Sequence, residues 1–257
     1  MLRKAFLSAG FAGLLMISPA AAQETGPQPL SSALAAVRSG NWENAATIAQ
    51  RAGPEAVELI EWHRLRAGRG RAHEVLAFLE RNPDWPGLAL LRRRSEEAFV
   101  TASDEEVLRF FDGQTPQTGT GVLRYAAALK AAGRTGEAEA GLVLGWHTLE
   151  LNRLEHDVFI EMHGPLLAPH HAARLDMVLW RGLTGDAERM LPLVSAERQA
   201  LAKARLALKA QRDGVNGLID AVPAALKDDA GLAHDRFNWR VQKGLTDSAI
   251  ELLLARS

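Results

Sequence analysis

Three tryptophans lie one or two residues before an arginine and are the first candidates for chemistry. They are Trp62 before Arg64, Trp180 before Arg181 and Trp239 before Arg240. Indole rings stack on sugars and guanidinium groups bind carboxylates, so such pairs could line a binding groove. Alternatively, the rings fill gaps between packed helices while the arginines extend into water. We favour the second interpretation, because large rings dominate helical cores.

Histidines cluster in one short window and are the second candidates. They are His147, His156, His163, His170 and His171. His156 and His163 would share one side of a helix, but neither an H-E-x-x-H pattern nor a carboxylate at helical spacing surrounds them. We therefore expect no metal and no cofactor. His170 and His171 are expected to open a helix after Pro169.

Acidic runs are the third candidates. They occur at Glu96-Glu97, Asp104-Glu105-Glu106 and Asp228-Asp229. Glycoside cleavage needs an acid whose pKa is raised in an apolar pocket, and no run stands in a setting that indicates one. We interpret these runs, and the Arg92-Arg93-Arg94 run, as solvated surface. Because P-loop, G-x-S-x-G and dinucleotide-binding patterns are also missing, we expect no catalytic residue in this chain.

The first 22 residues are typical of a secretory signal. Arg3 and Lys4 precede an apolar run at 5–17, and three alanines end at Ala22 before Gln23, where we expect cleavage. A retained anchor helix is the alternative, but the run is too short to span a bilayer comfortably. The chain has no Cys, so neither a lipid anchor nor disulfides are expected. The product should be periplasmic, with no membrane anchor after cleavage.

The composition favours helices throughout. Apolar residues make up 47% and charged residues 24% of the chain, Ala, Leu, Arg and Glu dominate, and no convincing alternating strand occurs. The formal net charge of −1 gives no reason to expect nucleic acid as a partner. We expect an all-α protein.

The helices should be positioned as hairpins. Residues 58–87 give two short helices separated by Gly68 and Gly70 and stopped at Asn82-Pro83. A signature G-x-W/T-x-x-A opens at Gly40, Gly133, Gly182 and Gly244, and residues 174–191 align with 236–253 at an offset of 62.

Each residue of the signature has a physical reason. Glycine can take the left-handed conformation that ends a helix, threonine can cap the next one, and alanine lets the two helices approach. Such units must stack on one another. The prediction is a superhelix of degenerate tetratricopeptide-like hairpins over residues 31–257, after a linker at 23–30.

Five stretches carry a resemblance to a known family. They are E-W-H-R-L-R-A-G-R-G (61–70), F-L-E-R-N-P-D-W-P (78–86), H-A-A-R-L-D (171–176), W-R-G-L-T-G-D-A (180–187) and D-R-F-N-W-R (235–240). They resemble the N-terminal superhelical domain of the soluble lytic murein transglycosylases, and the resemblance covers about residues 30–256. The N-P-D-W-P stop is its most specific piece.

The resemblance implies a U-shaped or ring-shaped wall of helix pairs, followed by a lysozyme-like domain with one catalytic Glu. Such enzymes cleave the β-1,4 bond between N-acetylmuramic acid and N-acetylglucosamine in peptidoglycan and form a 1,6-anhydro product. The family's Glu-Ser and G-L-M-Q segments do not occur here. The expected function is therefore the scaffold of such an enzyme, inactive alone and truncated before its catalytic domain.

The alternative is a stand-alone exported helical-repeat adaptor that binds protein partners. The expected partners are peptidoglycan strands for the scaffold and other proteins for the adaptor. Ile250, Leu252, Leu253 and Leu254 give the last helix the character of an interior repeat rather than a polar terminal one. The residues that would contact a glycan are not identified by the sequence.

Overall fold

A computed structural model describes residues 28–255, and these form helices joined by short turns, with no strand among them. The all-α prediction is thus confirmed. The expected signal segment, its cleavage between Ala22 and Gln23, and most of the expected linker lie outside the described residues. The helices are α1 Pro29–Arg38, α2 Trp42–Ala49, α3 Pro54–Arg66, α4 Ala72–Arg81, α5 Leu88–Ser95, η1 Glu96–Phe99, α6 Asp104–Phe110, α7 Gly119–Ala131, α8 Thr135–Thr148, α9 Arg153–Leu167, η2 Ala168–His170, α10 His171–Trp180, α11 Thr184–Met190, η3 Leu191–Leu193, α12 Ala196–Lys209, α13 Val215–Asp220, η4 Ala224–Leu226, α14 Ala230–Gln242 and α15 Thr246–Leu254.

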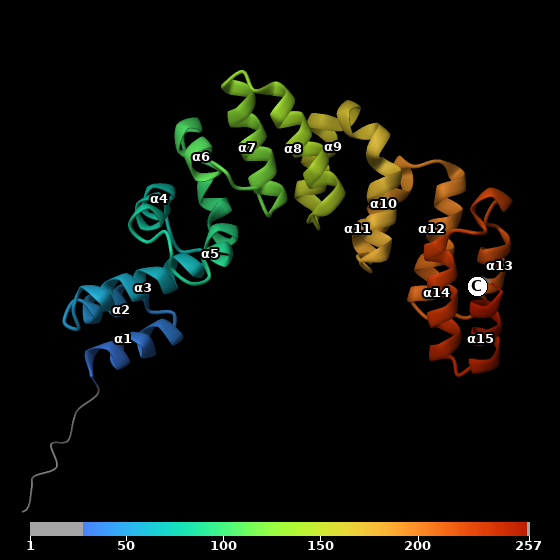
Figure 1. The fold of residues 1–257 in the computed structure, drawn as a ribbon, viewed down its shortest axis with the longest axis horizontal. Coiled ribbons are helices and arrows are strands. Elements are labelled where there is room, and N and C mark those ends of the chain that lie inside the picture. The colour runs from blue at the N-terminus through green and yellow to red at the C-terminus, as the bar shows by residue number, and fades with distance from the viewer. Residues whose placement is uncertain (1–27, 256–257) are drawn as a thin grey trace, which may run out of the picture. The chain divides into compact units, whose positions relative to one another are not determined.

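The chain divides into two compact units, and the division falls inside α3, after Ile60. In the first unit α1 and α2 lie side by side (Figure 1). Its core is small and rich in alanine. The buried members are Ala33, Ala36, Ala45, Ala49, Ala56 and Ile60. Such small side chains let the helix axes approach closely, as the sequence predicted for Ala45.

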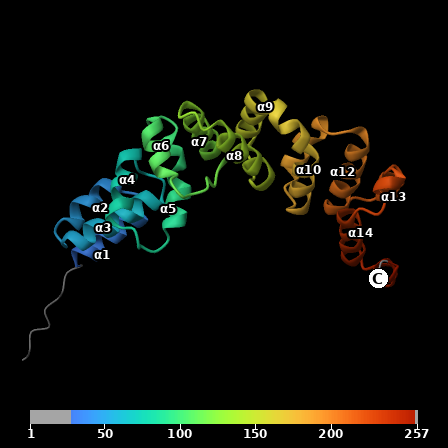
Figure 2. The same ribbon diagram turned by 45° about the horizontal axis from the view of Figure 1, so that its top comes forward.

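The second unit begins at Glu61 and is built from antiparallel helix pairs that follow one another along the chain (Figures 1 and 2). Its buried apolar side chains form three clusters. The first is centred on Phe78, Phe99 and Phe110, the second on Trp146 and Phe159, and the third on Leu201 and Leu232. Each cluster draws on consecutive helices, so neighbouring hairpins bury apolar side chains against one another.

The hairpin turns follow the predicted glycine signature. Gly40, Gly133, Gly182 and Gly244 have φ of 73°, 76°, 72° and 75°. In this left-handed region a glycine ends a helix without steric cost. The signature alanines are buried in every copy, which confirms that they sit where helices approach: Ala45, Ala138, Ala187 and Ala249.

The predicted capping role of the signature threonines is wrong. Thr135, Thr184 and Thr246 are the first residues of their helices, and the residue before each makes no side-chain cap. A side chain caps only from the position before the first helical residue. In the first copy Asn41 occupies that position and its Oδ1 accepts from the backbone N–H of Asn44 at 3.2 Å.

One expected boundary also differs from the structure. α1 starts at Pro29, inside the expected linker, because proline suits a first helical turn. α5 starts at Leu88, directly after Gly87, whose φ of 70° lies outside the right-handed helical region. α9 continues through Pro165 to Leu167.

No helix among residues 28–255 combines the length and the apolar character needed to cross a lipid bilayer.

Candidate functional site

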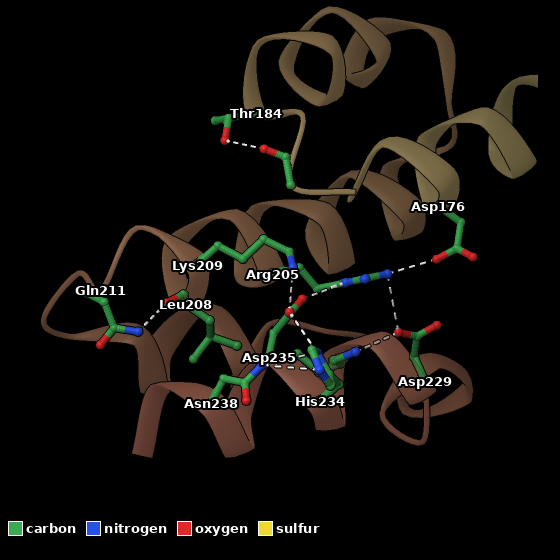
Figure 3. Close-up of polar contacts among 12 residues, drawn as sticks. Asp176, Thr184, Arg205, Leu208, Lys209, Gln211, Asp229, His234, Asp235 and Asn238 are labelled. Carbon is green, nitrogen blue, oxygen red and sulfur yellow. Dashed lines mark hydrogen bonds and ion pairs between the residues drawn. The ribbon is translucent and has the colours of Figure 1, made fainter. Parts of the chain in front are cut away.

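A buried arginine organises a network of polar contacts among the last hairpins of the second unit (Figure 3). Arg205 lies on α12, a helix capped by Ser195 that buries Leu201 and Leu208 on one side. The Arg205 Nε donates to Asp235 Oδ2 on α14 at 2.9 Å, and its Nη1 donates to Asp176 Oδ1 on α10 at 2.8 Å. One guanidinium group therefore holds three helices together.

The backbone makes room for this guanidinium at Gly231. A Cβ built on Gly231 would overlap the Arg205 guanidinium, so a larger residue at this position would require the guanidinium to move. Asp229, at the start of α14, caps Leu232 through its Oδ1 and lies 3.8 Å from Arg205 Nη1. Trp180 of α10 has its ring centroid 5.2 Å from Arg205 Cζ, close enough for a cation–π interaction.

A polar cleft of about 390 Å³ opens beside this network. It is lined by the start of α11, the end of α12 and one side of α14. Asp235, Asn238 and Gln242 belong to that side of α14, at i, i+3 and i+7. The lining residues are Gly182, Thr184, Leu208, Lys209, Ala210, Gln211, Asp235, Asn238 and Gln242.

The charged groups of the cleft neutralise one another. Asp235 Oδ2 receives the Arg205 guanidinium, and its Oδ1 lies 2.7 Å from Lys209 Nζ. Because both oxygens are paired, Asp235 is not arranged to transfer a proton. The remaining polar side chains are a threonine hydroxyl and the amides of Gln211, Asn238 and Gln242, which both donate and accept hydrogen bonds. Such a surface suits a neutral, polyhydroxylated ligand.

A second buried arginine repeats this arrangement one hairpin earlier. Arg174 on α10 donates through Nη2 to Asp186 Oδ1 on α11 at 3.1 Å, and through Nη1 to the Trp146 carbonyl at 2.6 Å. Its Cζ lies 4.3 Å from the Trp146 ring centroid. Arg189 shares Asp186 Oδ1 at 2.7 Å. Tryptophan, arginine and aspartate from successive helices thus recur as a structural unit.

The predicted tryptophans mostly fill gaps between helices, as we favoured. Trp62 packs against Trp85 and donates from Nε1 to the Pro86 carbonyl at 3.0 Å. Trp239 donates to the Arg212 carbonyl at 3.1 Å and packs on the cluster around Leu201. Trp180 differs, because 45% of it is exposed. It is the most exposed of the three tryptophans.

The adjacent arginines do not simply extend into water. Arg64 pairs with Glu74 at 3.1 Å. Arg181 donates to the Thr148 carbonyl at 3.0 Å, and Arg240 donates from Nε to Ser248 Oγ at 2.9 Å. Arg181 is exposed, as expected, whereas Arg64 and Arg240 are partly buried, so the expectation that the arginines extend into water is wrong for these two.

The interpretation of the Glu96-Glu97 run as solvated surface is wrong for Glu96. This side chain is buried; its Oε1 accepts from the Gln117 backbone N–H at 2.7 Å and its Oε2 from the Thr118 N–H at 2.9 Å. Burial raises the pKa of the Glu96 carboxyl, against the lowering effect of these hydrogen bonds. Glu96 anchors the turn before α7, and with both oxygens bonded it is not placed to protonate a glycoside.

The basic run is likewise only partly surface. Arg93 and Arg94 are exposed, but Arg92 is half-buried and donates from Nη1 to the Phe110 carbonyl at 2.9 Å. Burial lowers the pKa of Arg92. Glu106 of the second acidic run takes part in a capping box at the start of α6. Ser103 Oγ accepts from the Glu106 N–H at 3.3 Å, and Glu106 Oε2 accepts from the Ser103 N–H at 3.0 Å.

The histidines of the predicted window do not form a single cluster, and two of them pack around Trp146. His156 and His171 lie 5.4 Å and 5.6 Å from its ring, and His147 contacts His170 at 4.8 Å. Burial, with Arg174 and Arg189 nearby, lowers the pKa of His156 to about 4. Across residues 28–255 no three histidine or carboxylate side chains come together as a metal site would require. As predicted, His171 opens α10.

The sequence alone did not identify the cleft residues Lys209, Gln211, Asn238 and Gln242. The available signal was the polar side of α14, where Asp235, Asn238 and Gln242 recur at helical spacing.

Comparison of the chain with models of protein families, with characterised proteins and with solved structures finds no match.

Proposed function

We propose that this chain is the superhelical scaffold of an exported lytic transglycosylase, and that its polar cleft holds a peptidoglycan glycan strand. The composition of the cleft carries the proposal. Amides at Gln211, Asn238 and Gln242 and the hydroxyl of Thr184 match the mixed donors and acceptors of sugar hydroxyl and N-acetyl groups. The exposed ring of Trp180, in contact with Arg205, supplies a flat surface nearby for sugar stacking.

The residues that carry the family resemblance support the same proposal. Asp176, Trp180, Asp186 and Asp235 all belong to the quoted stretches, and each contacts one of the two buried arginines. Trp62 and Pro86, from two other stretches, are hydrogen-bonded to each other. These stretches therefore join hairpins, as a stacked superhelical wall requires.

In this proposal the chain binds and positions the strand but does not cleave it. Both Asp235 oxygens are engaged by cations, and both Glu96 oxygens by hydrogen bonds. The acid–base Glu would belong to a lysozyme-like domain, as the resemblance implies. Action on the cell wall requires a periplasmic location, which agrees with the signal expected at 1–22.

Co-sedimentation with purified peptidoglycan sacculi tests glycan binding. We expect the wild-type chain to pellet with sacculi, and the double variant Asn238→Ala/Gln242→Ala to bind at least tenfold more weakly. Asn216→Ala is the matched control, because it removes an exposed amide from α13 outside the cleft. Equal binding by all three proteins would contradict the assignment of the cleft.

Product analysis of the same incubations tests the absence of catalysis. Sacculi incubated with the chain alone should release no 1,6-anhydro-muropeptides. Their enzymatic release by the purified chain would show that one of its own carboxyl groups is catalytic.

A further inference from the structure

One side of α9 forms a groove with α11 and η3, separate from the polar cleft. The α9 residues that line it recur at i, i+3, i+4, i+7 and i+8, which places them on one face of the helix. The groove has a volume of about 480 Å³ and shares no lining residue with the cleft beside Asp235. Its lining residues are Arg153, His156, Asp157, Ile160 and Glu161 of α9, Arg189 of α11, and Pro192 and Leu193 of η3.

The end of the groove at the start of α9 carries an excess of positive charge. Arg189 Nη2 donates to the Leu151 carbonyl at 2.7 Å, which fixes the guanidinium at that end. Arg189 also shares Asp186 with the buried Arg174, so two guanidinium groups have one carboxylate between them. Both hydrogen bonds of Arg189 are made by Nη2, and its Nη1 has no acceptor among residues 28–255. This guanidinium can therefore still bind an anion.

His156 is a buried polar side chain that lines the same end of the groove. It is 4% exposed, and its Nδ1 is enclosed without a hydrogen-bond partner among residues 28–255. Burial, with Arg174 and Arg189 nearby, lowers the pKa of His156 to about 4, so the ring is neutral at pH 7. We assign the proton to Nε2, because buried N–H groups without acceptors are rarer than buried acceptors without donors. Nε2 then has an N–H to donate to an oxygen atom in the groove.

The rest of the groove is apolar and ends at a carboxylate. Ile160 and Leu193 are partly buried and pack against a buried cluster, and Pro192 is exposed beside them. Glu161 is exposed about two helical turns after the start of α9, and its charge disfavours a second negative charge on a ligand. The groove therefore suits a ligand with one anionic end and an uncharged, apolar body.

We propose that this groove binds a small monoanion in which a carboxylate is attached to a branched aliphatic group. Arg189 and His156 donate to the carboxylate, and the aliphatic group packs on the apolar part of the groove. Arg153 and Asp157, 3.8 Å apart, compensate each other and leave the positive charge of Arg189 available. A branched carboxylic acid and a peptide that ends in leucine share this chemistry. The inference does not rest on glycan binding, because the two sites have no residue in common.

N-acetyl-L-leucine is the probe, and its amide, which lacks the negative charge, is the matched control ligand. Titration of the full chain at pH 7, followed by ligand-detected nuclear magnetic resonance, should show saturable binding of the acid and a Kd at least tenfold larger for the amide. Pro192 is exposed at the groove, so charges can be placed there without disturbing Arg189. Pro192→Glu should raise the Kd of the acid at least threefold by repulsion, whereas Pro192→Lys should not raise it.

His156→Phe tests the hydrogen bond from the imidazole. It keeps an aromatic ring against Trp146 and should raise the Kd of the acid at least threefold. His163→Phe is the matched control, because His163 belongs to the same helix but does not line the groove, and it should leave the Kd unchanged. Circular dichroism checks that all variants remain folded.

The peptide acetyl-glycyl-glycyl-leucine distinguishes the two sources of the carboxylate. Tighter binding of this peptide than of N-acetyl-leucine assigns the groove to a peptide C-terminus, and equal or weaker binding assigns it to a free acid. The proposal is overturned if the acid shows no saturable binding, or if acid and amide bind equally. It is also overturned if Pro192→Glu and Pro192→Lys have the same effect, or if His156→Phe binds the acid as wild type does.

Discussion

Arg205 Nε and Asp235 Oδ2 lie 2.9 Å apart with both side chains buried, and this pair joins α12 to α14. Lys209 Nζ approaches the other Asp235 oxygen at 2.7 Å. Desolvating these charges is costly, and the cost is offset only while each charge keeps its partners. The pair therefore fixes how the hairpins next to the polar cleft are joined.

Removing one partner of this pair should destabilise the second unit strongly. Asp235→Ala leaves the Arg205 guanidinium buried without its main counter-charge, so we expect a loss of about 3–5 kcal/mol in the free energy of unfolding. Urea denaturation followed by circular dichroism measures it. Asp213→Ala is the control, because it breaks the exposed Lys243–Asp213 pair at 2.9 Å and should cost less than about 1 kcal/mol. Equal losses would contradict the structural role of Asp235.

A single methyl group at Gly231 should also disrupt the network. Gly231→Ala places a Cβ where the Arg205 guanidinium lies, and overpacking of this kind costs about 1–3 kcal/mol. Gly217→Ala, in α13, meets no atom within 4 Å and should be neutral or stabilising, because alanine favours helices. The melting temperatures of the two variants should move in opposite directions, or only that of Gly231→Ala should fall. A fall of equal size in both would rule out the steric explanation.

The sequence predicts those features that depend on local residue preferences. Turn glycines such as Gly182 and buried alanines such as Ala187 are identifiable because a left-handed turn and a close helix approach each tolerate few residue types. Helix starts are harder to place. Thr184 has the chemistry of a cap but lies one position too late, and that register depends on the turn geometry.

The polar contacts between hairpins could not be predicted in the same way. Arg174 and Arg205 resemble any surface arginine in a helical sequence. Arg174 is buried by the packing of α10 on α8 and α11, and Arg205 by the packing of α12 on α10 and α14. Glu96 is predicted to lie at the surface because it stands beside Glu97. In the structure it begins a 3-10 helix, and its buried carboxylate accepts hydrogen bonds from the backbone N–H groups of residues 117 and 118. Contacts over 20 to 30 positions carry no periodic signal in one sequence.

Replacing Glu96 should expose its anchoring role. In Glu96→Gln the amide nitrogen, which is itself a donor, faces the backbone N–H of Gln117 or Thr118, and two donors cannot form a hydrogen bond. We therefore expect the free energy of unfolding to fall by about 1–3 kcal/mol. Burial raises the Glu96 pKa above its ordinary 4.5, so the folded chain holds this proton more tightly than the unfolded chain. The stability that wild-type Glu96 contributes should therefore decline as pH rises above 4.5 through the raised pKa.

Thermal melts of wild type and Glu96→Gln between pH 4 and pH 7 measure both effects. Their difference in melting temperature should be largest at the acidic end and narrow as pH rises. Glu97→Gln, which changes the exposed neighbour, should follow the wild type at every pH. A gap between wild type and Glu96→Gln that widens with pH would contradict the raised pKa.

His156 should make the second unit sensitive to acid. Its pKa is lowered from 6.5 to about 4 by burial and by Arg174 and Arg189, so the unfolded chain takes up this proton first as pH falls. Stability is therefore lost as pH falls from 6.5 towards 4, by up to about 3 kcal/mol at about 1.4 kcal/mol per pH unit.

His156→Phe keeps a ring against Trp146 and removes the titration. Urea midpoints at pH 7.5 and pH 4.5 should thus differ less for His156→Phe than for wild type, whereas His73→Phe, on the exposed side of α4, should retain the wild-type difference. An unchanged difference in His156→Phe would mean that other groups account for the acid sensitivity.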